Sequence, residues 1–213
     1  PDGYTVLLHH IGMATTPALY RKLPFNVLND FEFLGMVNDV PMTLVGRSTL
    51  PAGTMPELMK WLEANKGKIN LANAGLGAAS HLCGLLFQQA VKIDMTTVPY
   101  KGTAPAMTDL LGGQVDLMCD QTTNTTQQIE SGKVKAYAVT TTKRLTTPAL
   151  AKLPTLDESG LKGFNVSIWH GLYAPKGTPK AVADKMNTAL RAALKATEFI
   201  KRQEALGAVV VTD

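Results

Sequence analysis

Long apolar runs, aromatic side chains and clustered charge are all scarce in this chain of 213 residues. No apolar run approaches the roughly 18 residues of a membrane-spanning helix, so direct membrane insertion is not expected. Only 6% of the residues are aromatic, and the net charge of +4 comes from scattered lysines and arginines. A nucleic-acid-binding protein would show a basic stripe with interleaved aromatics. The composition therefore argues against nucleic acid as a partner.

Cysteine is also scarce, since the chain has only Cys83 and Cys119. A zinc site needs three or four ligands at short intervals, so neither a metal nor another cofactor is expected. Two cysteines are compatible with one disulfide in an oxidising compartment, but two small buried hydrophobic side chains are the default interpretation. The length is sufficient for one large domain or for two small lobes.

Strands and helices are expected to alternate through the middle of the chain. The expected strands are Ile69–Asn73, Asp94–Tyr100, Val115–Cys119 and Val134–Thr140, with helices at about 78–91, 103–111 and 122–131 between them. Such alternation favours an α/β fold with mainly parallel sheets and helices on both faces. The inner face of the helix at 78–91 is expected to carry Leu82, Leu85, Leu86 and Ala90.

The flanking segments are less regular. Short strands are expected at Tyr4–His9, Phe33–Val37 and Met42–Gly46, and a long helix is expected to start at Thr178 and Pro179. The chain begins abruptly without a signal peptide, and residues 208–213 resemble a strand that stops without a tail. We therefore expect a fragment of a longer protein.

Three turns of the alternating region could bind an anion. In an open α/β sheet, ligands bind at the carboxyl ends of strands, where helices begin with unpaired amides. The turns in question are 72–81, 99–105 and 119–123. A single glycine turn more often serves packing than binding, but three along one sheet edge favour the binding of a small anion. We expect the bound anion to accept amide hydrogen bonds at the turns after Asn73 and Tyr100.

Catalytic interpretations have less support, and no catalytic residue is assigned. The sequence lacks a G-x-S-x-G elbow, and its four histidines have no metal-ligand spacing. Asp116 and Asp120 lie four apart on one expected strand, so they could form a carboxylate pair, although Asp120 equally suits a turn or a ligand amine. Two other classes stay open: an α/β enzyme that uses His81 or Asp120 on a carboxylic acid, and a sensing module that docks on a receptor kinase.

Several motifs in this order resemble the tripartite tricarboxylate transporter substrate-binding family, also called Bug receptors. The resemblance covers essentially the whole chain. The motifs are Pro1–Thr5, Ala72–Leu82, Val98–Gly102, Leu110–Asp116 and Trp169–Pro179.

The resemblance implies a monomeric periplasmic receptor with two α/β lobes in a type II-like Venus-flytrap arrangement. Such receptors deliver di- or tricarboxylates, acidic amino acids or aromatic acids to a membrane permease. By this analogy residues 1–42 and 142–213 form lobe 1, residues 43–141 form lobe 2, and the hinge crossings lie near 40–44 and 139–143. Family members also have an N-terminal strand, glycine-rich loop and helix, together with a final helix, and these are expected to be missing here.

The same analogy predicts ligand-binding residues in both lobes. The His9-His10 pair stands where relatives often have small polar residues, so an unusual ligand preference is expected. The predicted residues are His10, Ile11 and Gly12 in lobe 1, and Asn73, Gly75, Gly77, Ala78, Ser80, His81, Tyr100, Lys101, Gly102, Thr103, Asp120 and Gln121 in lobe 2.

Overall fold

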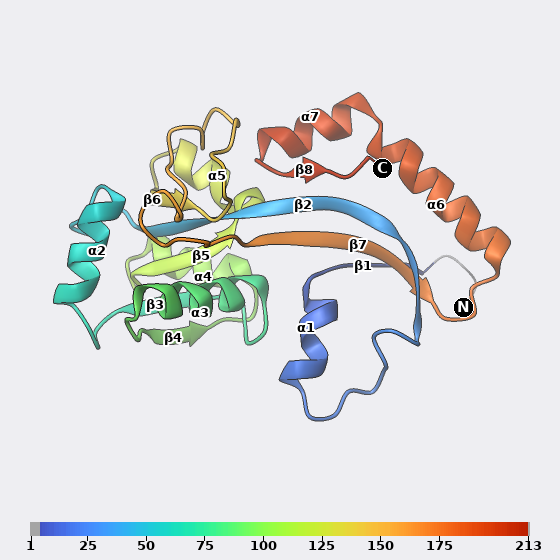
Figure 1. Ribbon diagram of the computed structural model, residues 1–213, viewed down its shortest axis with the longest axis horizontal. Coiled ribbons are helices and arrows are strands. Elements are labelled where there is room, and N and C mark those ends of the chain that lie inside the picture. The colour runs from blue at the N-terminus through green and yellow to red at the C-terminus, as the bar shows by residue number, and fades with distance from the viewer. Residues whose placement is uncertain (1–4, 213) are drawn as a thin grey trace. The chain divides into compact units, whose positions relative to one another are not determined.

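The computed structural model describes residues 5–212 and divides the chain into two compact units (Figure 1). Unit 1 contains Pro1–Val40 and Ile168–Asp213, and unit 2 contains Pro41–Ser167. The irregular segment 142–167 thus packs within unit 2. The predicted lobe boundaries and hinge crossings near 40–44 and 139–143 concern a functional motion and stay a prediction.

Unit 2 contains the predicted alternation of strands and helices. Its α2 helix begins at a complete capping box, in which Thr54 and Glu57 bond each other's backbone amides. The elements are α2 (Met55–Ala64), β3 (Asn70–Asn73), α3 (Ala79–Val91), β4 (Thr96–Pro99), α4 (Thr103–Leu111), β5 (Leu117–Gln121), α5 (Thr122–Glu130) and β6 (Val134–Val139).

The sheet of unit 2 is mixed rather than mainly parallel. Strand β3 pairs in parallel with β4 and β5. Strand β2 (Phe31–Arg47) pairs antiparallel with both β5 and β6. The expectation of a mainly parallel sheet is corrected here, because β2 enters from unit 1 and runs against the strands of the alternating region.

Strand β2 also replaces two shorter strands that the sequence predicted. Asn38, Asp39 and Pro41 were the expected break, yet the strand runs through them. Its pairing with β8 involves Asn38 and Asp39, and its pairing with β5 begins at Met42. Pro41 lies between these two ladders, so its missing N–H removes no bond from either.

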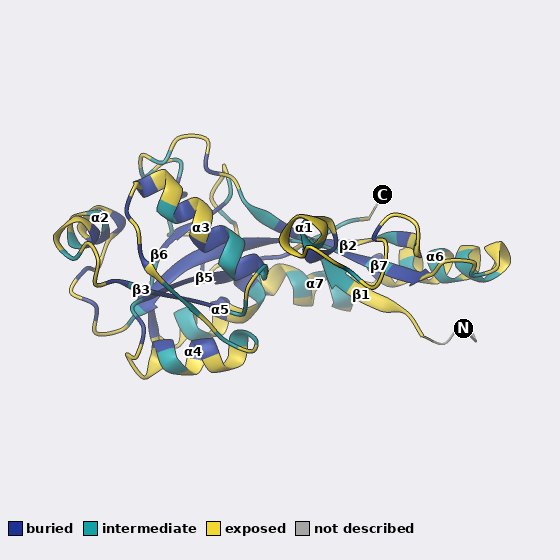
Figure 2. Ribbon diagram, turned by 90° about the horizontal axis from the view of Figure 1, so that it is seen from below, coloured by how far each residue is buried: buried dark blue, intermediate teal, exposed yellow. Residues whose placement is uncertain are grey.

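Helices cover both faces of the unit 2 sheet, with α3 on one face and α4 and α5 on the other (Figure 2). Each face of the sheet has its own apolar core, because alternate residues of a strand point to opposite faces. Ala72 and Met118 pack against Met107 and Leu110 of α4. Leu71 lies instead beneath α3, within 2.9 Å of the position that a Cβ on Gly84 would take.

The buried face of α3 differs from the predicted one. Leu85 and Leu86 are 44% and 45% exposed, whereas Cys83, Phe87 and Val91 are buried. Cys83 is bonded to Cys119 of β5 with the two Cα atoms 5.9 Å apart. The default of two unpaired thiols is therefore wrong. Phe87 and Val91 follow Cys83 by four and eight residues, so the three side chains share the face of α3 that lies against the sheet.

Unit 1 is smaller and its strand pairs are antiparallel. β1 (Leu7–His10) pairs with β7 (Ser167–Pro175), and the two-residue β8 (Val209–Val210) pairs with β2. Its helices are α1 (Gly12–Leu19), α6 (Lys180–Leu194) and α7 (Thr197–Ala205). The α6 helix begins one residue later than expected, after Pro179. Tyr4 and Asp213, the outer ends of two predicted strands, lie outside the described residues.

Candidate functional site

Three strand ends of unit 2 lie next to one another and carry most of the predicted site residues. The register of β3 against β4 sets Asn73 beside Pro99, and its register against β5 sets Ala72 beside Met118. The turns that follow are in contact, because Gly102 N–H donates to Ala74 O at 3.0 Å. A Cβ on Gly75 would lie only 3.1 Å from Tyr100 O. The structure therefore brings the three predicted turns together.

Side chains next to the turn after β3 accept hydrogen bonds from three of its backbone amides. Gly75 N–H donates to Asn73 Oδ1 at 2.9 Å, and Ala74 N–H donates to Ser80 Oγ at 2.8 Å. Gly77 N–H donates to His81 Nδ1 at 3.1 Å. We expected these amides to be open to a ligand carboxylate, and three of them are instead bonded to side chains. Sequence reasoning found the glycines but not the acceptors that the neighbouring side chains supply.

The open donors lie at the starts of three helices. The N-cap residues of α3, α4 and α5 are Ala78, Gly102 and Gln121, and none makes a side-chain cap hydrogen bond. Helix α2, by contrast, is fully capped. An uncapped helix start leaves amides without intrahelical partners and a partial positive charge. Three such starts follow β3, β4 and β5, so this edge of the sheet suits an anion.

The second turn depends on glycine for its backbone. Gly102 has φ 108° and ψ 171°, which favours glycine, and no atom lies within 4 Å of its Cβ position. Lys101 is exposed beside it. The Tyr100 hydroxyl donates to Asp109 Oδ2 at 2.7 Å, and this bond raises the pKa of Tyr100 to about 12. The phenol is therefore committed to α4, and Tyr100 contributes its backbone to the edge.

Asp120 is the buried carboxyl of the site, at 1% exposure. Burial raises its pKa to about 6, and hydrogen bonds from the Gln121 amide and from the side chains of Asn124 and Thr103 oppose that rise. The bond from Asn124 Nδ2 to Asp120 Oδ2 is 3.2 Å long. Asp120 thus ties the start of α4 to the start of α5, and no ion pair with it is found among residues 5–212.

Asp116 and Asp120 do not form a carboxylate pair. Asp116 precedes β5, where it pairs with Arg47 Nε at 3.1 Å and accepts Asn70 N–H at 2.9 Å. Asp120 lies at the other end of the strand, and four residues of extended chain span roughly 13 Å. The pair considered from the sequence is therefore excluded, and Asp116 has a structural role.

Two buried polar groups near the strand ends have no protein partner within the described chain. They are Asn73 Nδ2, whose residue is 2% exposed, and Thr122 Oγ1, whose residue is fully buried. Buried polar groups are normally hydrogen-bonded. Thr122 lies in the predicted turn 119–123 but was not among the predicted ligand-binding residues, although a hydroxyl directly after a strand end was a usable signal.

The predicted residues of unit 1 surround the start of α1. Gly12 N–H donates to His10 Nδ1 at 3.0 Å, and Ile11 is the N-cap residue without a side-chain cap. The His10 ring stacks on His9 with centroids 4.5 Å apart and meets the edge of His170 at 6.0 Å. Burial, with added repulsion from His9 and His170, lowers the pKa of His10 to about 4. His10 is therefore held in its neutral form.

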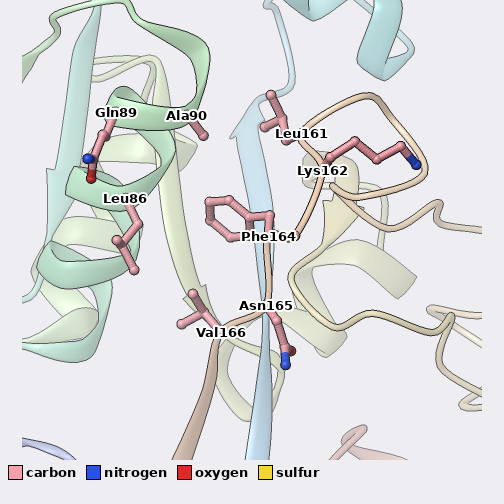
Figure 3. A pocket seen from close by; sticks show the side chains of 9 residues that line it. Leu86, Gln89, Ala90, Leu161, Lys162, Phe164, Asn165 and Val166 are labelled. Carbon is pink, nitrogen blue, oxygen red and sulfur yellow. The ribbon is translucent and has the colours of Figure 1, made fainter.

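A separate pocket of unit 2 contains none of the predicted residues. It has a volume of about 260 Å³ and lies between the outer face of α3 and the loop 161–166. Figure 3 shows Leu86 and Ala90 of the helix facing Leu161, Phe164 and Val166 of the loop. Leu86, which was expected on the inner face of α3, thus forms part of one wall of an open apolar pocket.

Neither a metal-binding cluster nor a membrane-spanning helix occurs in the part of the chain that the structure describes. No group of three or more histidine, cysteine, aspartate or glutamate side chains there could hold a metal ion. None of the described helices is long and apolar enough to cross a bilayer.

Comparison with known proteins identifies the family of the chain. Residues 1–211 match the model of the tripartite tricarboxylate transporter family receptor, TctC. The chain belongs to this family. A UPF0065 protein from the ttuE–ttuC′ intergenic region of Agrobacterium vitis is 49% identical over 99% of the chain. The family and its fold are those of solute-binding receptors and not of enzymes.

Solved structures of periplasmic binding proteins confirm the two-lobed α/β fold. The structure of the periplasmic binding protein BugD is 57% identical, with a TM-score of 0.94, over 100% of this chain and 70% of that one. MatC from Rhodopseudomonas palustris, solved with bound malate, is 37% identical, with a TM-score of 0.90, over 99% and 71%. The chain spans about 60% of the length of the Agrobacterium relative.

Proposed function

We propose that this chain is the larger part of a periplasmic receptor that captures a small carboxylate and delivers it to the permease of a tripartite transporter. The observation that carries the proposal is the set of three uncapped helix starts, α3, α4 and α5, at one edge of the unit 2 sheet. Malate in the related MatC supports the ligand class.

The expected affinity follows from these donors. A hydrogen bond to a charged group contributes about 1.5–3 kcal/mol, and a helix start adds roughly 0.3–1 kcal/mol. Two or three bonds and two helix starts reach the approximately −8 kcal/mol of micromolar binding. The only basic side chain among the predicted residues of unit 2, apart from His81, is the exposed Lys101. Directed amides and helix dipoles would therefore supply most of the binding energy, with partial rather than full positive charge.

A thermal-shift screen of the full-length protein against di- and tricarboxylates, acidic amino acids and aromatic acids tests the proposal. A ligand at a hundred times its Kd stabilises the folded state by about 2.7 kcal/mol, which corresponds to a shift of several degrees for a protein of this size. No shift with any acid would refute the proposed function.

A pair of glycine variants then tests the site. Gly77 and Gly132 have φ angles of 77° and 65°, so valine strains both backbones to a similar extent. Only Gly77 lies at the proposed edge. Gly77→Val should abolish the ligand-induced shift, whereas Gly132→Val should lower the melting temperature but keep the shift. Equal shifts in both variants would remove the turn after β3 from the binding site.

A further inference from the structure

The hydrogen bond from the Gly77 amide determines which ring nitrogen of His81 carries the proton. The Gly77 amide donates to His81 Nδ1 at 3.1 Å. A backbone N–H is only a donor, so Nδ1 must carry its lone pair. Burial lowers the pKa of His81 and thus favours the neutral ring. In that ring the proton must lie on Nε2.

The Nε2–H group is available to a ligand. His81 is partly exposed, and the Gly77 bond is its only hydrogen bond to the described residues. It lies in the first turn of α3, whose start is uncapped. The ring therefore presents a fixed, uncharged donor beside the open amides of the helix.

Asn73 has the same pattern independently. Its Oδ1 accepts the Gly75 amide at 2.9 Å, and its buried Nδ2 has no protein partner within the described part of the chain. The glycine turn thus occupies the single acceptor of the neutral His81 ring and one of the two lone pairs on Asn73 Oδ1. Each side chain keeps an N–H donor that no described protein group accepts. Two such donors suit a ligand atom that only accepts hydrogen bonds, as a carboxylate oxygen does.

We propose that His81 is a neutral hydrogen-bond donor to the ligand carboxylate through Nε2–H, and that the Gly77 amide selects the tautomer that makes it one. This rests on the proposed function and deepens it. The amides of the glycine turn would thus orient Asn73 and His81 as donors to the ligand, in addition to any amide that faces the ligand directly. Gly77 is then a positioning residue for His81.

Two variants separate the roles of the ring nitrogens. In His81→Asn the side-chain oxygen can take the place of Nδ1 and accept the Gly77 amide, but no group reaches the Nε2 position. In His81→Gln the longer side chain places an amide donor near the Nε2 position and gives up the Nδ1 contact. Gln89→Asn, an exposed change on the same helix, serves as the matched control.

Calorimetry with malate and succinate on the full-length protein gives the binding readout. Loss of a hydrogen bond to a charged group should weaken binding roughly ten- to a hundredfold. We expect that loss in His81→Asn, a smaller loss in His81→Gln and none in Gln89→Asn. Binding by His81→Asn at wild-type strength would overturn the proposal and leave the proposed function intact.

Nitrogen NMR of protein labelled at histidine reads the tautomer without any ligand. We expect His81 to show a protonated Nε2 and an unprotonated Nδ1, and a Gly77→Val variant to lose this preference. A protonated Nδ1 in the wild-type protein would overturn the proposed lock. If the wild-type protein binds no carboxylate at all, the proposed function and the donor role both fail, while this measurement still decides the tautomer.

Discussion

The Cys83–Cys119 disulfide should be the largest single stabilising feature of unit 2. It joins residues 36 apart in sequence. Closing a loop of this length in the unfolded chain lowers its entropy enough to stabilise the folded state by about 4 kcal/mol. Both sulfurs are buried, at 0% and 1% exposure for their residues, so the bond holds α3 on β5 in a region that water does not reach.

Urea denaturation with and without a reductant measures this contribution. With a slope of about 2 kcal/mol per molar urea, loss of the disulfide should lower the transition midpoint by roughly 2 M. The double variant Cys83→Ala with Cys119→Ala should unfold near the reduced wild-type midpoint, and reductant should not shift it further. A midpoint change of less than about 0.5 M on reduction would refute the loop-entropy argument.

Two further predictions concern the edge of the unit 2 sheet. Gly102 has a φ of 108° with open space around its Cβ position, so Gly102→Ala should destabilise the protein by about 1–3 kcal/mol through backbone strain alone. Gly112 has a φ of −77°, so the control Gly112→Ala should change stability by less than about 1 kcal/mol. Equal effects of the two variants in urea denaturation would contradict this reasoning. The pKa of Asp120 is raised from 3.8 to about 6, so its contribution to stability is full below pH 3.8 and is lost as the pH rises through 6. The stability of Asp120→Asn relative to wild type should therefore increase by about 2–3 kcal/mol between pH 4 and pH 7.5, and parallel pH profiles of the two proteins would show that the carboxyl is not desolvated.

The sequence predicted the order of elements in unit 2 well, because local signals determine it. Apolar periodicity and turn residues indicated β3 to β6 and the helices between them, and the Thr54–Glu57 capping box marked the start of α2. These signals act over a few residues and need no knowledge of the rest of the chain.

What the sequence could not predict depends on contacts between distant residues. The antiparallel direction of β2 relative to β5 depends on pairing between residues more than 70 positions apart. Pro41 indicated a break in β2 that the structure does not have. The predicted inner face of α3 was wrong because it was chosen from four apolar positions, whereas Cys83 is bonded to Cys119 of the distant strand β5. Contacts with distant elements, and not the local apolar pattern, determine which helix face is buried and how strands pair.

The candidate site shows the same division. Gly75, Gly77 and Gly102 were visible as turn signals, and all three have positive φ angles. The acceptors that bind the turn amides were not visible, since a sequence does not state which way the side chains of Asn73 and His81 point. Whether the predicted residues contact a ligand stays a prediction.

The division of the chain into units also has a consequence for how the protein folds. Unit 2 is one continuous stretch, Pro41–Ser167, whereas unit 1 is built from segments on either side of it. Unit 1 cannot close until residues separated by the whole of unit 2 meet, and joining distant segments is slow because the loop-closure entropy must be overcome first. During folding, unit 2 should be able to collapse before the first segment of unit 1 meets the second. That early segment exposes apolar side chains such as Leu8, Leu28 and Phe33, which remain more than half exposed even in the folded structure. The interval before the two segments meet is therefore when this protein most needs protection from aggregation.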